Sequence, residues 1–216
     1  TLRNASGLEL LEVQDLAYTL LGLNTQREPF GDPRVRRAIN LAIDRDEIVT
    51  AVYFGDAVPG GPLSPGLDQW ALDTDEFACY DHDPDAARAL LAEAGYPDGF
   101  ELEILTFGTI KVVSDLAQVL QAQLTEVGID TTVNVAEFGT FVQDWRNSDF
   151  QAFVSLNGGN ADPDGYFYRT FHSTGATNVF QYADDTVDRL LERGRSSADD
   201  AARYATYAEL QRILAC

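Results

Sequence analysis

Residues 100–135 read FELEILTFGTIKVVSDLAQVLQAQLTEVGIDTTVNV, and this stretch decides the fold. Residues 100–107 form an apolar-rich run that is typical of a strand. Apolar residues then recur at helical spacing over residues 112–127, and a glycine ends that pattern. Apolar and polar residues alternate over residues 129–135, which predicts a second strand. A strand, a helix of about four turns and a strand form a βαβ unit, so we expect two parallel strands joined by a right-handed crossover.

The flanking segments predict further elements of the same α/β domain. Helix starts are marked by Asp32 before Pro33 and by Asp44 with Glu47 three residues later, because such side chains cap free backbone N–H groups. Proline and glycine interrupt residues 56–82, which predicts a long irregular segment. The remaining expected elements are strands at 17–24 and 150–156 and helices at 33–43, 45–53, 84–94, 141–146, 185–195 and 199–214.

The charge of the chain limits its partners. Its 216 residues include 35 acidic and 15 basic side chains, for a formal net charge of −20, and Lys111 is the only lysine. Binding to nucleic acid requires clustered Lys and Arg that replace counterions around phosphates, and the sequence has no such cluster. We therefore expect no nucleic-acid partner. Anionic membrane surfaces are disfavoured for the same reason.

Two cysteines, Cys79 and Cys216, lie far apart in the sequence. They form neither a zinc motif nor a Cys-x-x-Cys redox pair. A disulfide between them is possible in an oxidising compartment. The sequence favours free thiols, because Cys216 is the last residue of the chain and is expected to lie at a frayed end.

The best-placed candidate site is the loop GGNADPDG at residues 158–165, because ligands of open α/β sheets collect outside the carboxyl ends of the strands. One interpretation is a calcium loop, but Phe171 stands where an EF-hand needs a bidentate glutamate. A second is a plain turn in which Asp162 precedes Pro163 and Gly165 supplies an unusual φ. In a third, Asp162 offers its carboxylate to a cationic ligand group beside the aromatic residues Tyr166, Phe167 and Tyr168. The sequence excludes the first interpretation and leaves the other two open.

No catalytic constellation is present in the sequence. His82 follows an acidic turn, and His172 precedes Ser173, but adjacent residues rarely present their side chains to each other. The chain has no nucleophile elbow, no phosphate loop and no dinucleotide fingerprint. Two separated histidines and two separated cysteines do not supply a zinc site. The sequence therefore predicts no metal, no cofactor and no enzyme activity.

Several blocks of sequence resemble one known family. Residues 23–44 read LNTQREPFGDPRVRRAINLAID, and residues 53–59 read YFGDAVP. Residues 83–99 read DPDAARALLAEAGYPDG, and residues 127–130 and 204–214 continue the likeness. The chain resembles the family-5 extracellular solute-binding proteins of ABC importers, which serve dipeptide, oligopeptide and nickel uptake.

The resemblance implies a periplasmic-binding-protein-like lobe, with a βαβ-containing mixed sheet flanked by helices. Residues 1–24 are then expected to be a hinge strand and a stub of the partner lobe, and residues 25–216 the C-terminal ligand-binding lobe. The implied partners are a small-molecule or peptide ligand, the N-terminal lobe of the same protein and ABC permease subunits. The implied location is extracellular or periplasmic, with the full-length protein lipid-anchored to the membrane.

The resemblance also implies site residues. Asp162, with Asn160 beside it, stands where peptide-binding members carry an aspartate that pairs with the α-amino group of the peptide. Lys111 is the available cation for a ligand carboxylate, although dipeptide binders usually carry arginine there. Phe107, Trp145, Trp70 and Tyr166 are candidates for stacking on the ligand.

Two other functions remain open at this point. A sensory or regulatory domain can reuse the same lobe, and a DNA-binding module elsewhere in the gene would favour that function. A hydrolase is the second alternative, which no motif in the chain supports.

Overall fold

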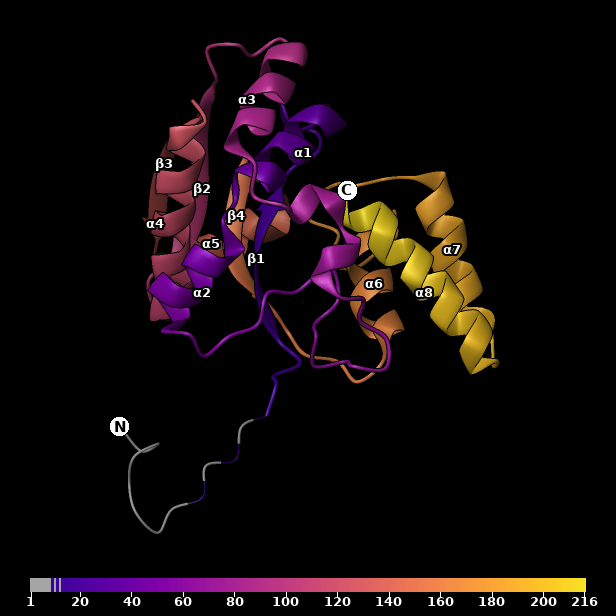
Figure 1. The fold of residues 1–216 in the computed structure, drawn as a ribbon. Coiled ribbons are helices and arrows are strands. Elements are labelled where there is room, and N and C mark those ends of the chain that lie inside the picture. Colours follow the sequence, from indigo (N-terminus) through magenta and orange to yellow (C-terminus); the bar gives the residue numbers. More distant parts are fainter. Residues whose placement is uncertain (1–8, 10, 12) are drawn as a thin grey trace.

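The computed structural model describes residues 9, 11 and 13–216 (Figure 1). Of the predicted hinge strand and stub at residues 1–24, residues 1–8, 10 and 12 lie outside the described residues. Among those described, four strands form one sheet: β1 (Tyr18–Leu23), β2 (Glu101–Phe107), β3 (Asp130–Ala136) and β4 (Ala152–Asn157). The chain thus has the α/β class that the sequence predicts.

The sheet has the order β1-β4-β2-β3 and is mixed. β2 pairs in parallel with β3 and with β4, whereas β1 pairs antiparallel with β4, from Tyr18 opposite Asn157 to Leu23 opposite Ala152. The parallel β2–β3 pair confirms the predicted βαβ unit. The two edges of the sheet, among the residues described, are β1 and β3.

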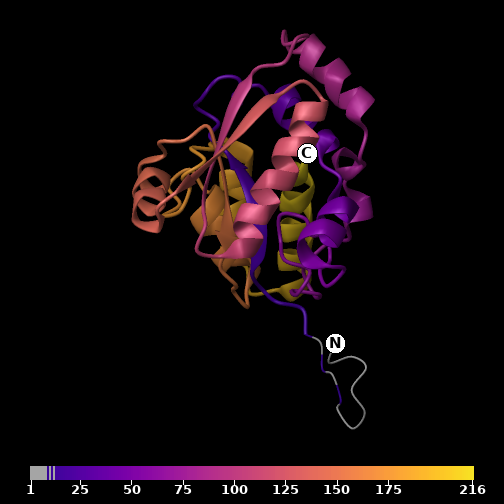
Figure 2. The ribbon, with the colours of Figure 1, turned by 90° about the vertical axis from the view of Figure 1, so that its left-hand side faces the viewer.

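Helices cover both faces of this sheet. α4 (Lys111–Glu126) packs on β2, β3 and β4, and α2 (Arg45–Tyr53) packs on α4. α1 (Pro33–Ala42) packs against α3 (Pro84–Glu93), and α5 (Phe138–Asn147) lies on the opposite side of the sheet from α4 (Figure 2). The two predicted caps form: Asp32 accepts from Arg34 N and Asp44 from Glu47 N. Asp83 caps α3 in the same way and accepts from Ala86 N.

Three further helices form a group beside the sheet: α6 (Pro163–Phe171), α7 (Asp185–Ser196) and α8 (Asp200–Ala215). They have their own hydrophobic core, which includes buried Phe167, Leu191 and Tyr207 and part of the irregular segment through Leu63 and Leu67. The larger core lies between the sheet and α1–α5. The lobe therefore has two adjoining cores.

The irregular segment and α6 differ from the sequence prediction. Two short 3-10 helices, η2 (Thr74–Glu76) and η3 (Ala78–Tyr80), lie within residues 56–82. No helix is predicted at 163–171, yet Pro163 occupies the first turn of α6 and Asp162 is its N-cap. Gly165 lies inside that helix and is not among the glycines with positive φ, so the proposed unusual backbone angle is wrong.

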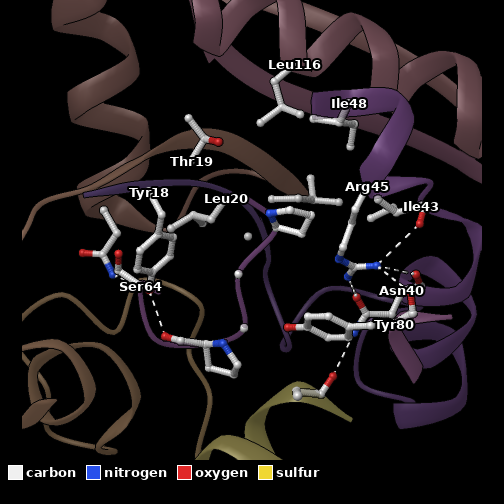
Figure 3. A pocket seen from close by; sticks show the side chains of 18 of the residues that line it. Tyr18, Thr19, Leu20, Asn40, Ile43, Arg45, Ile48, Ser64, Tyr80 and Leu116 are labelled. Atoms are coloured by element: carbon white, nitrogen blue, oxygen red, sulfur yellow. Dashed lines mark hydrogen bonds between the residues drawn. The ribbon is translucent and has the colours of Figure 1, made fainter. Parts of the chain in front are cut away.

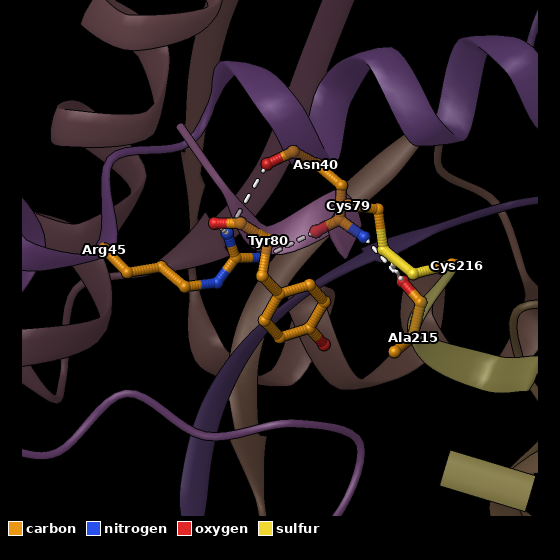
Figure 4. Close-up of a disulfide and its surroundings, with 6 residues drawn as sticks. All are labelled: Asn40, Arg45, Cys79, Tyr80, Ala215 and Cys216. Carbon is orange, nitrogen blue, oxygen red and sulfur yellow. Dashed lines mark hydrogen bonds between the residues drawn. A yellow bond between two sulfur atoms is a disulfide. The ribbon is translucent and has the colours of Figure 1, made fainter. Parts of the chain in front are cut away.

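The expectation of free cysteines is also wrong. Cys79 and Cys216 form a disulfide across a sequence separation of 137 residues. The C-terminal end of α8 packs beside η3, where Ala215 and Phe77 share a small buried cluster. Cys216 therefore lies next to the fully buried Cys79 and not at a frayed end (Figure 4).

None of the helices in the described part of the chain has the length and apolar character needed to cross a membrane.

Candidate functional site

The carboxyl ends of two neighbouring parallel strands, β2 and β4, lie at the same end of the sheet. The loop at residues 108–110 leaves β2 and the loop at residues 158–162 leaves β4. β1 begins at this end of the sheet, because its first residue, Tyr18, pairs with Asn157, the last residue of β4. In open α/β sheets ligands bind outside the carboxyl ends of the strands, so we take this end of the sheet as the candidate site.

The loop after β4 is held close to the segment before β1. A Cβ added to Gly159 would lie 2.8 Å from the Cβ of Leu16, so only glycine allows this approach. Asn160 is exposed, and its Oδ1 accepts a hydrogen bond from Asp162 N at 3.1 Å. The loop therefore has a fixed path that presents Asn160 to solvent.

Asp162 has two intramolecular partners. Its Oδ1 accepts from Asp164 N at 2.9 Å, which caps the first turn of α6. Both carboxylate oxygens also accept from one guanidinium nitrogen of Arg203, at 2.8 and 2.9 Å. The Asp162 side chain is 49% exposed, so a ligand amino group could reach it but would compete with Arg203.

Lys111 begins α4 directly after the loop that follows β2. Its side chain is 84% exposed, and its Nζ lies 2.5 and 2.6 Å from the carboxylate oxygens of Asp115. Ile110, the N-cap, offers no side-chain hydrogen bond to the first turn. Free backbone N–H groups and a lysine therefore stand together, an arrangement that attracts anions.

Most of the aromatic candidates pack inside the protein. Phe107 is 3% exposed and contacts the rings of Phe138 and Phe141, and Tyr166 is fully buried. Trp145 is half-buried and meets Phe153 edge-on, while Trp70 meets Tyr207 edge-on. The structure therefore brings Asn160 and Asp162 together, places Lys111 at the start of α4 after the neighbouring loop, and gives the rings of Phe107 and Tyr166 core contacts.

A polar network that the sequence analysis missed lies at the end of β4. Asn157 Nδ2 donates to the hydroxyl of Tyr18 at 2.8 Å, and that hydroxyl donates to the carbonyl of Pro62 at 3.1 Å. Arg169, from α6, donates to Asn157 Oδ1 at 2.5 Å and to the carbonyl of Gly158 at 3.2 Å. The network joins four segments of the chain, and no local sequence pattern predicts such contacts. Burial raises the pKa of Tyr18 to about 12, so its hydroxyl stays protonated at neutral pH.

A cavity with a volume of about 690 Å³ runs along β1 (Figure 3). None of the seven candidate site residues named from the sequence lines it. Arg45 does, with its guanidinium 3.8 Å from the centre of the Tyr80 ring and 2.5 Å from Asn40 Oδ1. Burial lowers the pKa of Arg45, and no described carboxylate forms an ion pair with it. The cavity lining therefore combines apolar side chains with three arginines, Arg36, Arg37 and Arg45, and two aspartates, Asp15 and Asp56.

The histidines do not pair with a nucleophile. His172 Nδ1 accepts from Thr174 N at 3.1 Å, whereas Ser173 Oγ meets the carboxylate of Asp188. His82 Nδ1 lies 3.6 Å from Asp44 Oδ2. The described residues contain no cluster of three or more His, Cys, Asp or Glu side chains that could hold a metal ion.

Two relatives resemble this chain in sequence over nearly its whole length. The chain is 31% identical to the probable di/tripeptide-binding protein 5 of Pseudomonas aeruginosa over 98% of its own length and 41% of the relative's. It is 29% identical to heme-binding protein A of Haemophilus influenzae, over 96% of this chain and 39% of that protein. The chain therefore spans less than half the length of these relatives.

Solved structures match the fold as well. The periplasmic binding protein DppA of Helicobacter pylori, in complex with the peptide STSA, superposes with a TM-score of 0.84 at 30% identity, over 92% of this chain and 39% of that one. The oligopeptide-binding protein AppA of Bacillus subtilis, in complex with a nonapeptide, gives a TM-score of 0.83 at 29% identity, over 94% and 43%. The model of the bacterial extracellular solute-binding proteins, family 5 Middle, matches residues 1–178. The chain belongs to the family-5 bacterial extracellular solute-binding proteins.

Proposed function

We propose that this chain is the C-terminal lobe of a solute-binding protein that captures peptides and delivers them to an ABC importer. The observation that carries the proposal is the likeness of nearly the whole chain to part of two proteins that were solved with bound peptides. Residues 25–216 form the lobe in this proposal, and residues 1–24 lead from the partner lobe through β1. The ligand is enclosed when the second lobe closes over the candidate site, because a cleft needs two walls to bury most of a ligand.

The charges at the candidate site suit the two ends of a peptide. Lys111 and the uncapped start of α4 favour a carboxylate. Asp162 and exposed Asn160, on the neighbouring loop, favour an amino group. A cation and an anion on adjacent loops can therefore orient a zwitterionic ligand, with Asp162 exchanging Arg203 for the amino group when the ligand arrives.

Trp145 supplements this site as an aromatic contact in the proposal. It is only half-buried, so part of its indole remains available to a ligand. Phe107 and Tyr166 are buried, and in the proposal they support the loops of the site from the core. The proposed protein binds its ligand without converting it, works outside the cytoplasm with permease subunits, and is held at the membrane by a lipid anchor.

The proposal is tested by identifying the solutes that the full-length protein captures. Ligands retained through purification would be identified by native mass spectrometry, and synthetic peptides would be titrated by calorimetry. We expect peptide binding with the peptide recovered intact. A protein that retains only a non-peptide solute would overturn the peptide assignment, and reproducible cleavage of the bound peptide would overturn the assignment as a binding protein.

A further inference from the structure

The exposed apolar side chains of the lobe gather at the candidate site. Outside residues 1–13 and α8, the large apolar side chains that are exposed in the described part of the chain are Phe54, Val58, Ile110, Val135, Phe138 and Leu156. Ile110 follows β2, and Leu156 is the second-last residue of β4. Val135 and Phe138 flank the end of β3. Single exposed apolar residues need no explanation, but a group of them at one place marks a binding surface.

Phe54, the residue after α2, belongs to the same end of the sheet. Gln123 Nε2, late in α4, donates to Asp44 O at 3.1 Å, so the start of α2 lies beside the end of α4. The end of α2 therefore lies toward the start of α4. The hydroxyls of Tyr53 and Thr19 are 2.5 Å apart, which holds the last residue of α2 beside the start of β1.

Three of the exposed side chains border the loop that leads from β2 to Lys111. The ring of Phe138 lies 5.1 Å, centroid to centroid, from the ring of the last residue of β2. A Cβ added to Gly108 would lie 3.4 Å from Cγ1 of Val135. Ile110 directly precedes Lys111. Ile110, Val135 and Phe138, which we call the apolar patch, therefore lie around the loop that ends at the lysine.

Packing inside the lobe does not account for the apolar patch. Val133 and Val135 point to the same face of the sheet, because side chains alternate along a strand, yet Val133 is half-buried and Val135 is 51% exposed. Phe138 opens α5 and is 47% exposed, whereas Phe141, one turn later, is 4% exposed. About half of the surface of Val135 and of Phe138 is therefore available to a ligand.

The charge beside the apolar patch identifies the part of a peptide that would cover it. Lys111 and the uncapped first turn of α4 favour a carboxylate. In a peptide, the Cα that carries the terminal carboxylate also carries the side chain of the last residue. A carboxylate held at Lys111 therefore brings that side chain to the apolar patch. An apolar side chain gains from this contact, because both surfaces leave water, whereas a polar side chain loses its hydration there.

We propose that the site selects peptides whose carboxyl-terminal residue has an apolar side chain. The apolar patch contacts this side chain while Lys111 holds the carboxylate. This inference rests on the proposed function, because it specifies which peptides are captured.

The inference is tested by calorimetry of the full-length protein with two pairs of tripeptides. Ala-Ala-Leu and Ala-Ala-Gln differ only in the last side chain, and Leu-Ala-Ala and Gln-Ala-Ala differ only in the first. We expect Ala-Ala-Leu to bind at least about tenfold more tightly than Ala-Ala-Gln, because the polar side chain would be buried without a partner. The second pair should differ by less than about threefold, since its first residues lie away from the patch.

The tripeptides separate failure of this inference from failure of the proposed function. Binding of all four with equal affinity would leave peptide capture intact and overturn the apolar selection. A preference that appears only in the second pair would contradict the assignment of the patch to the carboxyl end. If none of the four binds, peptide capture is itself wrong, and the inference fails with it.

Two variants of the patch connect the preference to its residues. Phe138→Gln and Val135→Thr each remove apolar surface from an exposed position, and threonine keeps the β-branched shape that suits a strand. Tyr204→Gln is the matched control, because Tyr204 is an aromatic residue of similar exposure, 43% against 47% for Phe138, but lies in α8. The preference for Ala-Ala-Leu should fall at least about threefold in both patch variants and stay unchanged in the control. Melting curves check that all three variants are folded.

Other occupants of the patch would give different results. An equal loss of affinity for Ala-Ala-Leu and Ala-Ala-Gln in the patch variants would show that the patch meets the second lobe and not the ligand. Self-association that the patch variants abolish would identify a second copy as the occupant. Either result, or a preference that survives in both patch variants, would overturn the inference.

Discussion

Asp162 and Arg203, separated by 41 residues, form an ion pair in which both carboxylate oxygens accept from one guanidinium nitrogen. The Arg203 side chain is only 16% exposed, and it lies over the rings of Trp70 and Tyr207. The hydrogen bond that Arg203 donates to Asp162 raises the pKa of Arg203. The pair joins the start of α6 to α8, so a residue predicted from sequence to meet a ligand also holds two helices together.

Replacing Asp162 tests these two roles separately. Asparagine caps helices about as well as aspartate, so Asp162→Asn removes the charge and keeps the cap. Because a mostly buried guanidinium loses its partner, we expect the free energy of unfolding to fall by about 1–2 kcal/mol. Asp162→Ala should cost about 1 kcal/mol more, because it also removes the cap. Chemical denaturation of the three proteins measures both steps.

Ligand titration of the same variants decides the binding role. If Asp162 meets a peptide amino group in the closed protein, Asp162→Asn should weaken binding by at least about tenfold, which corresponds to about 1.4 kcal/mol. Arg203→Lys serves as the control, since it disturbs the ion pair and leaves the carboxylate in place. Unchanged affinity in Asp162→Asn would remove this residue from the ligand site.

The disulfide should contribute substantially to stability. It closes a loop across a sequence separation of 137 residues, and a cross-link over so long a loop restricts the unfolded chain strongly. We expect Cys79→Ser with Cys216→Ser to lower the free energy of unfolding by about 2–5 kcal/mol. Melting curves with and without reductant provide the control, because reductant should shift the wild type and leave the double variant unchanged. Equal stability of both proteins would contradict this expectation.

The regular elements of the fold could be predicted because their determinants are local. The capping aspartates 32, 44 and 83 stand directly before periodic apolar segments, and Gly95 and Gly128 adopt the positive φ that ends a helix. α6 was missed because its first turn contains Pro163 and Gly165, which read locally as a turn. Both residues fit a helix start once Asp162 caps it.

The site was less predictable because its contacts join distant segments. The pairing of Asp162 with Arg203, and the hydrogen bonds of Asn157 with Tyr18 and with Arg169, follow from how α6 and α8 pack beside the sheet. The disulfide follows from the same packing, which no spacing of two cysteines encodes. Burial of Phe107 and Tyr166 likewise depends on the tertiary fold, since an aromatic residue suits a core as well as a ligand site.

Tyr18 should make stability depend on alkaline pH. Burial raises its pKa from 10.0 to about 12, so the folded state holds the phenolic proton more tightly than the unfolded state does. The stabilisation is fully present below pH 10 and is lost as the pH rises from 10 to about 12. Tyr207, whose pKa burial also raises to about 12, should add to the same loss. Melting temperatures across this range should fall less steeply in Tyr18→Phe than in the wild type; parallel curves would contradict the assignment.

Lys111 gives the sharpest test of ligand orientation. Its ion pair with Asp115 is highly exposed, so Lys111→Gln should change the free energy of unfolding by less than about 0.5 kcal/mol. If Lys111 meets the carboxylate of a bound peptide, the same change should weaken binding of that peptide about tenfold, because the charge is lost where the closed lobes exclude water. A C-terminally amidated form of the peptide has no such carboxylate, so wild type and variant should bind it equally.

Calorimetry with both peptides and both full-length proteins measures the four affinities. An equal loss for the two peptides would show that Lys111 acts on something other than the carboxylate, and no loss for either would place the ligand carboxylate elsewhere.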